Sequence, residues 1–349
     1  MPVRGRFLTA LVAASTVLQA CDTRRPAQNR PDSVAAGAAP TKPFKVAFNT
    51  WIGYSPLVIA DRKGFLKAEG LDVEFSTLEG VAEKNSSLIQ GTVDAVGHTA
   101  DAAVVSAASG VDGQIVFVFD RSFGSDGIVT KRSVNSMKDL VGHKVALEPG
   151  FTGHFFFLTL LRDEGIDPSQ VQIIPMETGA AGSAFVAGRV EAAMTWQPWL
   201  GKVEQTRPDS KVLFSSASSG KDGRIIDILY MNRSVVQSRR ADVVKLVRAM
   251  GRATDWYLEP ANKAAGDSIM AAFWKLSPEE QRETVAGMKF MRLTENATFF
   301  GTSANPGPLF GVVNMAADLW LKTDVINKDV GRRELVAFDV MNEAATKPE

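Results

Sequence analysis

Three short stretches of the chain recur in the same order further along it, and this internal repeat constrains the fold more than any other feature. The pairs are Lys45-Val46-Ala47 with Lys144-Val145-Ala146, Glu69-Gly70-Leu71-Asp72 with Glu164-Gly165-Ile166-Asp167, and Gly91-Thr92-Val93-Asp94-Ala95 with Gly188-Arg189-Val190-Glu191-Ala192, at offsets of 99, 95 and 97 residues. Each match alone is weak. Three matches in one order at nearly one offset indicate two copies of the same structural unit.

Each copy alternates short strands with helices. Strands are predicted at 44–48, 72–76, 95–96 and 114–119 in the first copy and at 144–147, 171–174 and 192–195 in the second, with first helices at 56–69 and 153–164. Gly70 and Gly165 follow these helices, where glycine is typical of a helix end. Strands alternating with helices are typical of parallel β-α-β units. We therefore predict an α/β protein with two lobes of similar plan.

Two segments, at 128–130 and 224–232, are expected to cross between the lobes. After Ser234 the chain is mostly helical, and the helices expected to complete the first lobe lie at 240–257, 260–274, 278–291 and 308–322. Ser277 before Pro278 suits a helix start. The predicted division is lobe one at 44–127 plus 232–349 and lobe two at 128–231. Two crossings between two α/β lobes make a hinge around a cleft.

The first 20 residues have the pattern of a secretory signal. Arg4 and Arg6 precede an apolar run at 7–17, and small residues lead up to Cys21. This order of a basic start, a short apolar stretch and a cleavage point is typical of export signals. The apolar run is too short to remain as a membrane-spanning helix. We expect 1–20 to be removed.

Cys21 is the only cysteine of the chain. Leu18-Gln19-Ala20 before it resembles a bacterial lipobox, in which the cysteine becomes the acylated first residue, and Asp22 resembles an inner-membrane retention signal. An ordinary signal peptide with a chance cysteine is the alternative. Residues 21–43 lack the apolar residues that a core needs, so they read as the lipidated cysteine and a flexible tether with a reach of about 25 Å. The expected location is the periplasmic face of the inner membrane.

Composition excludes several classes of function. Of 349 residues, 45% are hydrophobic and the formal net charge is +0, which becomes about −2 without the signal arginines, so nucleic acid is not an expected partner. His98, His143 and His154 have no metal-binding spacing, and no thiol remains once Cys21 is acylated. Nucleophile-elbow, Walker and dinucleotide motifs do not occur in the sequence. No metal or cofactor is expected, and a binding role is favoured over catalysis.

Candidate ligand contacts lie after the predicted strands, because ligands of α/β sheets gather at the carboxyl ends of strands. Trp51 and Tyr54 follow the first strand and offer flat apolar faces, with Ser55 expected to cap the next helix. Thr99 follows the third strand of the first copy. In the second copy, Trp196 and Gln197 follow the third strand. Packing of the aromatic residues against the helix starts is the structural alternative.

The turn before the first helix of the second copy is a candidate anion site. Thr152 is the expected N-cap, and the backbone N–H groups of Gly153 and His154 can hold a carboxylate, sulfonate or phosphonate. A self-capped helix end is the alternative. His98 is more often a buried histidine than a ligand contact, and Asp101 is equally suited to a helix cap and to a ligand contact.

Further acidic candidates follow other predicted strands. They are Glu79, Asp120, Glu177 and Asp227. Each is a solvated charge by default. If two or more of them faced the cleft, they would favour a substrate carrying an amine.

Several segments resemble the nitrate/sulfonate/taurine-type substrate-binding proteins of ABC importers over roughly residues 44–340. The segments are 51–56 (WIGYSP), 60–66 (ADRKGFL), 88–95 (LIQGTVDA), 149–155 (PGFTGHF) and 196–200 (WQPWL). The resemblance implies a type II, two-lobed periplasmic-binding-protein-like fold and a tethered monomer that closes on a small solute and delivers it to a permease with its ATPase. The residues it places in the cleft are Trp51, Tyr54, Thr99, Thr152, His154, Trp196 and Gln197.

Glu148 departs from the usual sulfonate pattern, because its negative charge stands just before the anion-binding turn. A zwitterion or a neutral heterocycle stacked on Trp51 and Trp196 therefore becomes as good a ligand as a simple anion, and Glu148 joins the candidate contacts. Two other functions fit the same fold. One is a ligand-sensing lipoprotein that signals to a membrane partner, and the other is an enzyme on this scaffold.

Overall fold

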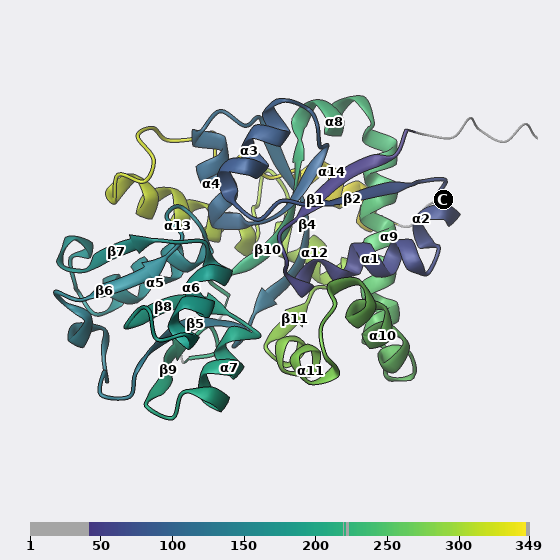
Figure 1. The fold of residues 1–349 in the computed structure, drawn as a ribbon. Coiled ribbons are helices and arrows are strands. Elements are labelled where there is room, and N and C mark those ends of the chain that lie inside the picture. The colour runs from purple at the N-terminus through teal and green to yellow at the C-terminus, as the bar shows by residue number, and fades with distance from the viewer. Residues whose placement is uncertain (1–41, 219, 221–222, 347–349) are drawn as a thin grey trace, which may run out of the picture. The chain divides into compact units, whose positions relative to one another are not determined.

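The computed structural model describes residues 42–218, 220 and 223–346, which form two mixed β-sheets with helices around them (Figure 1). Sheet A has the order β11-β4-β10-β3-β1-β2, and sheet B has the order β7-β6-β8-β5-β9. The strands of sheet A are β1 (Phe44–Phe48), β2 (Val73–Thr77), β3 (Ala95–Thr99), β4 (Gly113–Ser122), β10 (Ile226–Asn232) and β11 (Met288–Phe290). Those of sheet B are β5 (Asp126–Lys131), β6 (Lys144–Leu147), β7 (Gln172–Pro175), β8 (Ala192–Trp196) and β9 (Ser210–Ser215). Cys21, the signal and the tether lie outside the described residues.

The internal repeat is visible in the strand pairing. In sheet A, β1 lies between β2 and β3 in parallel, and in sheet B, β6 lies between β7 and β8 in parallel. Beside each set of three parallel strands lies an antiparallel strand that contains a predicted crossing segment. In sheet A this strand is β10, which pairs with β3, and in sheet B it is β5, which pairs with β8. The predicted α/β fold with two lobes is therefore confirmed. The segment 226–231, placed at the end of lobe two by the predicted division, pairs within sheet A.

Helices follow the strands as the repeat predicts. They are α1 (Ser55–Arg62), α2 (Phe65–Ala68), α3 (Val81–Ile89), α4 (Ala100–Ala108), α5 (Thr152–Asp163), α6 (Thr178–Val186), α7 (Trp199–Thr206), α8 (Arg233–Ser238), α9 (Arg240–Leu258), α10 (Lys263–Trp274), α11 (Pro278–Ala286), α12 (Leu293–Phe300), α13 (Pro308–Lys322) and α14 (Phe338–Ala345). Short 3-10 turns lie at Ile52–Tyr54, Met137–Leu140, Pro168–Gln170 and Pro260–Asn262. None of the helices within the described ranges is long and apolar enough to cross a membrane.

Two predicted helices are interrupted. The helix expected at 56–69 breaks into α1 and α2 at Gly64, whose φ of 72° is a left-handed conformation that favours glycine. The helix expected at 278–291 stops at Ala286, and the residues after it form β11, because Met288 to Phe290 pair with the edge strand β4. An edge strand with free hydrogen-bonding groups can recruit such a segment against its helical pattern.

Helix caps were predicted with mixed success. Ser277 caps α11 and forms a capping box with Glu280, as expected. Ser55 is instead the first residue of α1, and its hydroxyl donates to the Ile52 carbonyl at 2.5 Å. Thr152 is likewise the first residue of α5, and Phe151 occupies the N-cap position. Both predicted caps are wrong because each hydroxyl has another partner.

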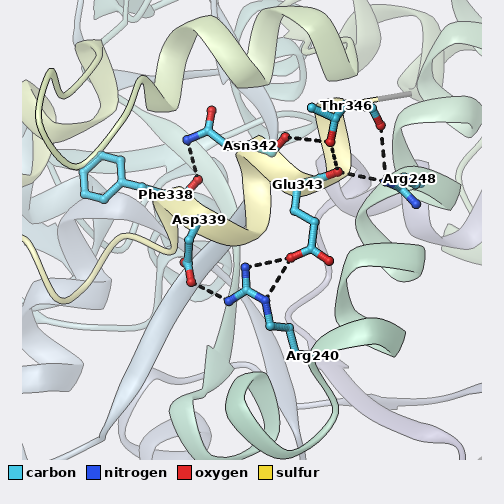
Figure 2. A network of polar contacts seen from close by, with 7 residues as sticks. All are labelled: Arg240, Arg248, Phe338, Asp339, Asn342, Glu343 and Thr346. Carbon is cyan, nitrogen blue, oxygen red and sulfur yellow. Dashed lines mark hydrogen bonds and ion pairs between the residues drawn. The ribbon is translucent and has the colours of Figure 1, made fainter. Parts of the chain in front are cut away.

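The C-terminal helix α14 is fastened to α9 by a polar network (Figure 2). The Arg240 guanidinium donates to Asp339 and to Glu343, with 2.8 Å between Arg240 Nη2 and Glu343 Oε2. Arg248 donates to the backbone carbonyls of Glu343 and Thr346 at 2.8 and 3.2 Å. Helix α9 also packs against α1 (Figure 1). The helical tail therefore completes the lobe that contains sheet A.

Candidate functional site

Five of the predicted contact residues converge on one small cavity between the two sheets. The cavity has a volume of about 10 Å³, which is room for one water molecule. Its walls are Asn49, Trp51, Tyr54, Thr99, Asp126, Phe151, Thr152, Trp196, Ile225 and Asp227. The predicted members are Trp51, Tyr54, Thr99, Thr152 and Trp196. Because both sheets contribute walls, this structure has the lobes closed on each other.

Trp51 stands in the loop between β1 and the 3-10 turn Ile52–Tyr54. Its ring faces Trp196, the last residue of β8 in the other sheet, with 5.9 Å between ring centroids. Gly53 allows this placement, because a Cβ there would lie 2.4 Å from Trp51 Nε1 and 2.4 Å from Asp120 Oδ2. The two tryptophans therefore form an aromatic contact between the lobes.

Tyr54 forms the wall on the side of sheet A. Its ring stacks on Phe48 at 5.1 Å, and its hydroxyl donates to Asn49 Oδ1 at 3.2 Å. Burial, followed by the charges of Asp227 and Asp120, raises the pKa of Tyr54 well above its usual value, so the phenol stays neutral. Tyr54 therefore offers an apolar face and a polar tip at the cavity.

Thr99 and Thr152 join the lobes at the base of the cavity. Thr99 ends β3 and Thr152 begins α5, and their hydroxyl oxygens lie 2.7 Å apart. Both residues are buried. Because one hydroxyl donates to the other, each helps to hold the lobes closed.

Lys84 was not predicted to have any role, yet it lies directly behind the cavity. It is fully buried, and its ammonium donates to Asn49 Oδ1 at 2.5 Å and to the Gly97 carbonyl at 2.8 Å. Burial lowers the pKa of Lys84 to about 8. A lysine inside a helical pattern gives no sequence signal for this position, whereas Asn49, at the end of a strand, could have been found by the rule that located Trp51.

Glu148 lies beside this lysine rather than in the cavity wall. Its Oε2 accepts from the Thr178 N–H and hydroxyl at 3.4 and 3.3 Å. Burial raises the pKa of Glu148, and the nearby Lys84 charge acts in the opposite direction. Glu148 can therefore affect a ligand through the charge of Lys84 without touching it in this conformation.

His154 and Gln197 are placed outside the cavity. His154 Nδ1 accepts from the Gly150 N–H at 3.1 Å, its ring packs on Trp320 at 5.2 Å, and burial lowers its pKa to about 4. Gln197 Oε1 accepts from the Gly201 N–H at 3.1 Å, and Gln197 lines a separate surface cavity. In this conformation neither residue lines the cavity that contains Trp51 and Trp196.

The acidic candidates separate into two groups. Asp227 lines the cavity, and Asp120 lies against its wall beside Trp51. Glu79 and Glu177 are not wall residues: Glu79 accepts hydrogen bonds from the Thr50 N–H and hydroxyl, and Glu177 precedes α6. Asp126, which begins β5, is a further wall residue that the sequence showed only as a lobe boundary. Burial raises the pKa of Asp126 to about 6.

A larger groove of about 740 Å³ lies between α5 and α13, and it includes His154, Arg162, Asp167 and Lys322. It has no tryptophan and is open to solvent on one side. The predicted contact residues other than His154 are absent from its walls. We therefore place the candidate site in the small cavity between the sheets.

Two similar α/β lobes, linked where β4 leads to β5 and where β9 leads to β10 and closed over a polar and aromatic cavity, have the architecture of the periplasmic-binding-protein class. The chain belongs to the NMT1-like family, whose model matches residues 37–271. Both statements agree with the predicted resemblance to substrate-binding proteins of ABC importers.

Known relatives are binding proteins. A binding protein of Brucella abortus (strain 2308) is 23% identical over 264 residues, which cover 74% of this chain and 81% of the relative. The taurine-binding periplasmic protein of Escherichia coli (strain K12) is 26% identical over 200 residues, covering 57% of this chain and 61% of that protein. The alkanesulfonate-binding protein from Xanthomonas axonopodis pv. citri, solved with MOPS bound, superposes with a TM-score of 0.69 at 18% identity, covering 86% of this chain and 99% of that one. These relatives are named as binding proteins, and the solved structure shows the same fold.

Proposed function

We propose that this protein is the solute-binding component of an ABC importer and that it holds a small solute between Trp51 and Trp196. The observation that supports the proposal most is a cavity walled by residues of both lobes, with a tryptophan ring from each. Closure of two lobes around a ligand is a known hinge motion of such proteins. The hinge would lie in the links from β4 to β5 and from β9 to β10, since β5 and β10 are each paired within one sheet.

The relatives suggest the range of solutes. Their names include taurine, alkanesulfonates and nitrate-like ligands, which are small and polar. The closed cavity has room for little more than a water molecule, so a solute of this size would enter only when the lobes separate, and with the solute bound the two rings would lie further apart than the present 5.9 Å. Small anions, zwitterions and small heterocycles are the classes to test.

A thermal-shift screen of such solutes tests the proposal. A solute at 100 times its Kd raises the free energy of unfolding by about 2.7 kcal/mol, which is readily measured. For a stabilising solute, Trp51→Ala and Trp196→Ala should weaken binding at least tenfold, while Trp256→Ala on α9, a tryptophan that packs on Lys63 away from the cavity, should not. Unchanged affinity in the first two variants would show that the site is elsewhere.

We also propose that the lipid on Cys21 keeps the protein beside its permease. The proposal rests on the lipobox-like sequence before Cys21 and on Asp22 after it. A single acyl chain binds a membrane only weakly, whereas several chains hold firmly. Cys21→Ser should move the protein from the membrane fraction to the soluble periplasmic fraction. Continued membrane retention of this variant would refute lipid anchoring.

A further inference from the structure

Carboxyl groups from both sheets meet beside the cavity. On sheet A, Asp227 of β10 lies directly opposite Thr99 of β3 on one side and Asp120 of β4 on the other. Residues opposite each other on neighbouring antiparallel strands share one face of the sheet. Asp126 comes from β5 of sheet B, where it is paired with Trp196. Asp126 and Asp227 line the cavity from opposite lobes.

These carboxyl groups are buried without enough partners. Asp120, Asp126 and Asp227 are 0%, 6% and 3% exposed. Within the described ranges, both oxygens of Asp120, the Oδ2 of Asp126 and the Nε1 of Trp51 lack a hydrogen bond of normal geometry. Asp227 still interacts with Asp120 and with Trp51, and these interactions lower the pKa values of Asp120 and Asp227, respectively. Buried polar atoms are normally paired, so these unpaired atoms at one cavity indicate that the missing partner is a ligand.

Lys84 is the buried cation whose charge acts on this cluster, through Asp227. Burial raises the pKa of all three carboxyl groups, and their mutual repulsion raises those of Asp120 and Asp227 further. The nearby Lys84 ammonium is already held by Asn49 and the Gly97 carbonyl. Keeping several carboxyl groups together in a buried place is costly unless a cation joins them. The cluster is therefore set up for a positively charged ligand group.

The surroundings favour an organic cation over a metal ion. In the described part of the chain, no three His, Cys, Asp or Glu residues are arranged to hold a metal. Aromatic rings instead surround the carboxyl groups, with Trp51 at 5.9 Å from Trp196 and Phe151 set edge-on to Trp196 at 6.2 Å. Aromatic faces attract organic cations, and the attraction grows when water is excluded.

We propose that the solute carries a positively charged nitrogen, which Asp126 and Asp227 hold between the rings of Trp51 and Trp196 with Asp120 behind them. This inference rests on the proposed function and narrows its solute class. An amino group within a zwitterion, or an ammonium or amidinium group, satisfies it. Nitrate and sulfonates without such a nitrogen would meet only carboxylates at this end of the cavity and should bind weakly.

Isothermal titration of the full mature chain with matched probes tests the inference. Taurine and isethionate differ by an ammonium in place of a hydroxyl, and choline and 3,3-dimethylbutan-1-ol differ by a quaternary nitrogen in place of a carbon. We expect taurine to bind at least tenfold more tightly than isethionate, or choline at least tenfold more tightly than 3,3-dimethylbutan-1-ol. Nitrate should bind more weakly than taurine or choline. Titration in two buffers of different ionisation enthalpy should show proton release, since a bound cation favours the ionised carboxylates.

Variants identify the groups that hold the nitrogen. Asp126→Asn and Asp227→Asn should each weaken binding of the cationic probe by about tenfold or more, because a charged hydrogen-bond partner is lost. Asp329→Asn, at an exposed ion pair with Arg332, is the matched control and should leave binding unchanged. Asparagine has nearly the same shape as protonated aspartic acid, so both Asn variants should fold. The two-buffer titration uses the wild-type protein and therefore tests proton release even if a variant does not fold.

The outcomes separate this inference from the proposed function. If isethionate or nitrate binds as tightly as the cationic probes, or if the two Asn variants bind like the wild type without proton release, the inference is wrong while solute binding stands. If no probe of any class binds, both proposals fail. Tight cationic binding that depends on Asp126 and Asp227 supports both.

Discussion

The buried carboxyl groups make the stability of the ligand-free protein depend on pH in an unusual direction. Asp126 has a pKa of about 6 in the folded protein, against 3.8 for an ordinary aspartate, because burial disfavours its charged form. Well below pH 4, the Asp126 carboxyl group is protonated in both the folded and the unfolded chain and does not change the free energy of unfolding. As the pH rises from about 4 to 6, the unfolded chain loses its proton first, so the free energy of unfolding falls.

The difference between the two pKa values sets the size of the effect. A pKa of about 6 against 3.8 corresponds to roughly 3 kcal/mol lost between pH 4 and pH 7 from Asp126 alone. Asp101, with a pKa of about 7, and the coupled pair Asp120 and Asp227 act in the same direction. Asp209 and Glu280, with pKa values of about 2, change stability mainly below pH 4. Burial lowers the pKa of His154 to about 4 and that of His98 well below 6.5, so these two groups raise stability as the pH rises from about 4 to 6.5, and the contribution of Asp126 is measured as the difference between wild type and variant.

Urea unfolding at intervals from pH 4.5 to 7.5 measures the effect. Relative to the wild type, Asp126→Asn should gain stability as the pH rises across this range, because the variant has no carboxyl group to ionise at this position. Asp329→Asn serves as the control, because the Asp329 pKa is lowered by Arg332 and its profile should follow the wild type. If the stability difference between Asp126→Asn and the wild type does not change with pH, the burial of an unpaired Asp126 is wrong.

Three other substitutions test separate parts of the structure. Gly53→Ala should lower the free energy of unfolding by about 1–3 kcal/mol and weaken solute binding, because its Cβ would lie 2.4 Å from Asp120 Oδ2. Gly311→Ala on α13 is the control and should not destabilise the protein, because nothing lies within 4 Å of its Cβ, and equal unfolding midpoints for the two variants would contradict the prediction. Lys202→Ala removes the 2.9 Å ion pair with Glu280 between α7 and α11, so stability should fall by about 0.2–1 kcal/mol in low salt and less in high salt. Arg240→Ala should speed amide hydrogen exchange in α14 but not in α5, and unchanged exchange in α14 would show that the network of Figure 2 does not hold that helix.

The sequence predicted the fold well because the repeat carries much of it. The strands at 44–48 and 144–147 and the helix at 308–322 have the predicted bounds, since apolar periodicity and flanking glycines define them locally. The errors arise where tertiary contacts decide. The short strand β11 exists because β4 offers it an edge, and Thr152 does not cap its helix because Thr99 of the other lobe is its partner.

The sequence predicted those site residues that follow strand ends, and it did not predict those that depend on tertiary contacts. The rule that ligands lie after strand ends found Trp51, Thr99 and Trp196, which depends only on order along the chain. The carboxylate cluster depends on which strands are neighbours. Asp120, Asp126 and Asp227 come from β4, β5 and β10, and only the antiparallel insertion of β10 between β3 and β4 places Asp227 beside Asp120. The burial of Lys84 is likewise a tertiary effect without a local signal.

The position of the bound solute is best tested by a crystal structure of the protein with the most stabilising solute of the screen. The solute should lie between the rings of Trp51 and Trp196, with one of its nitrogen atoms within hydrogen-bond distance of Asp126 or Asp227. A solute bound instead in the groove between α5 and α13, with the cavity between the sheets unchanged, would contradict the account.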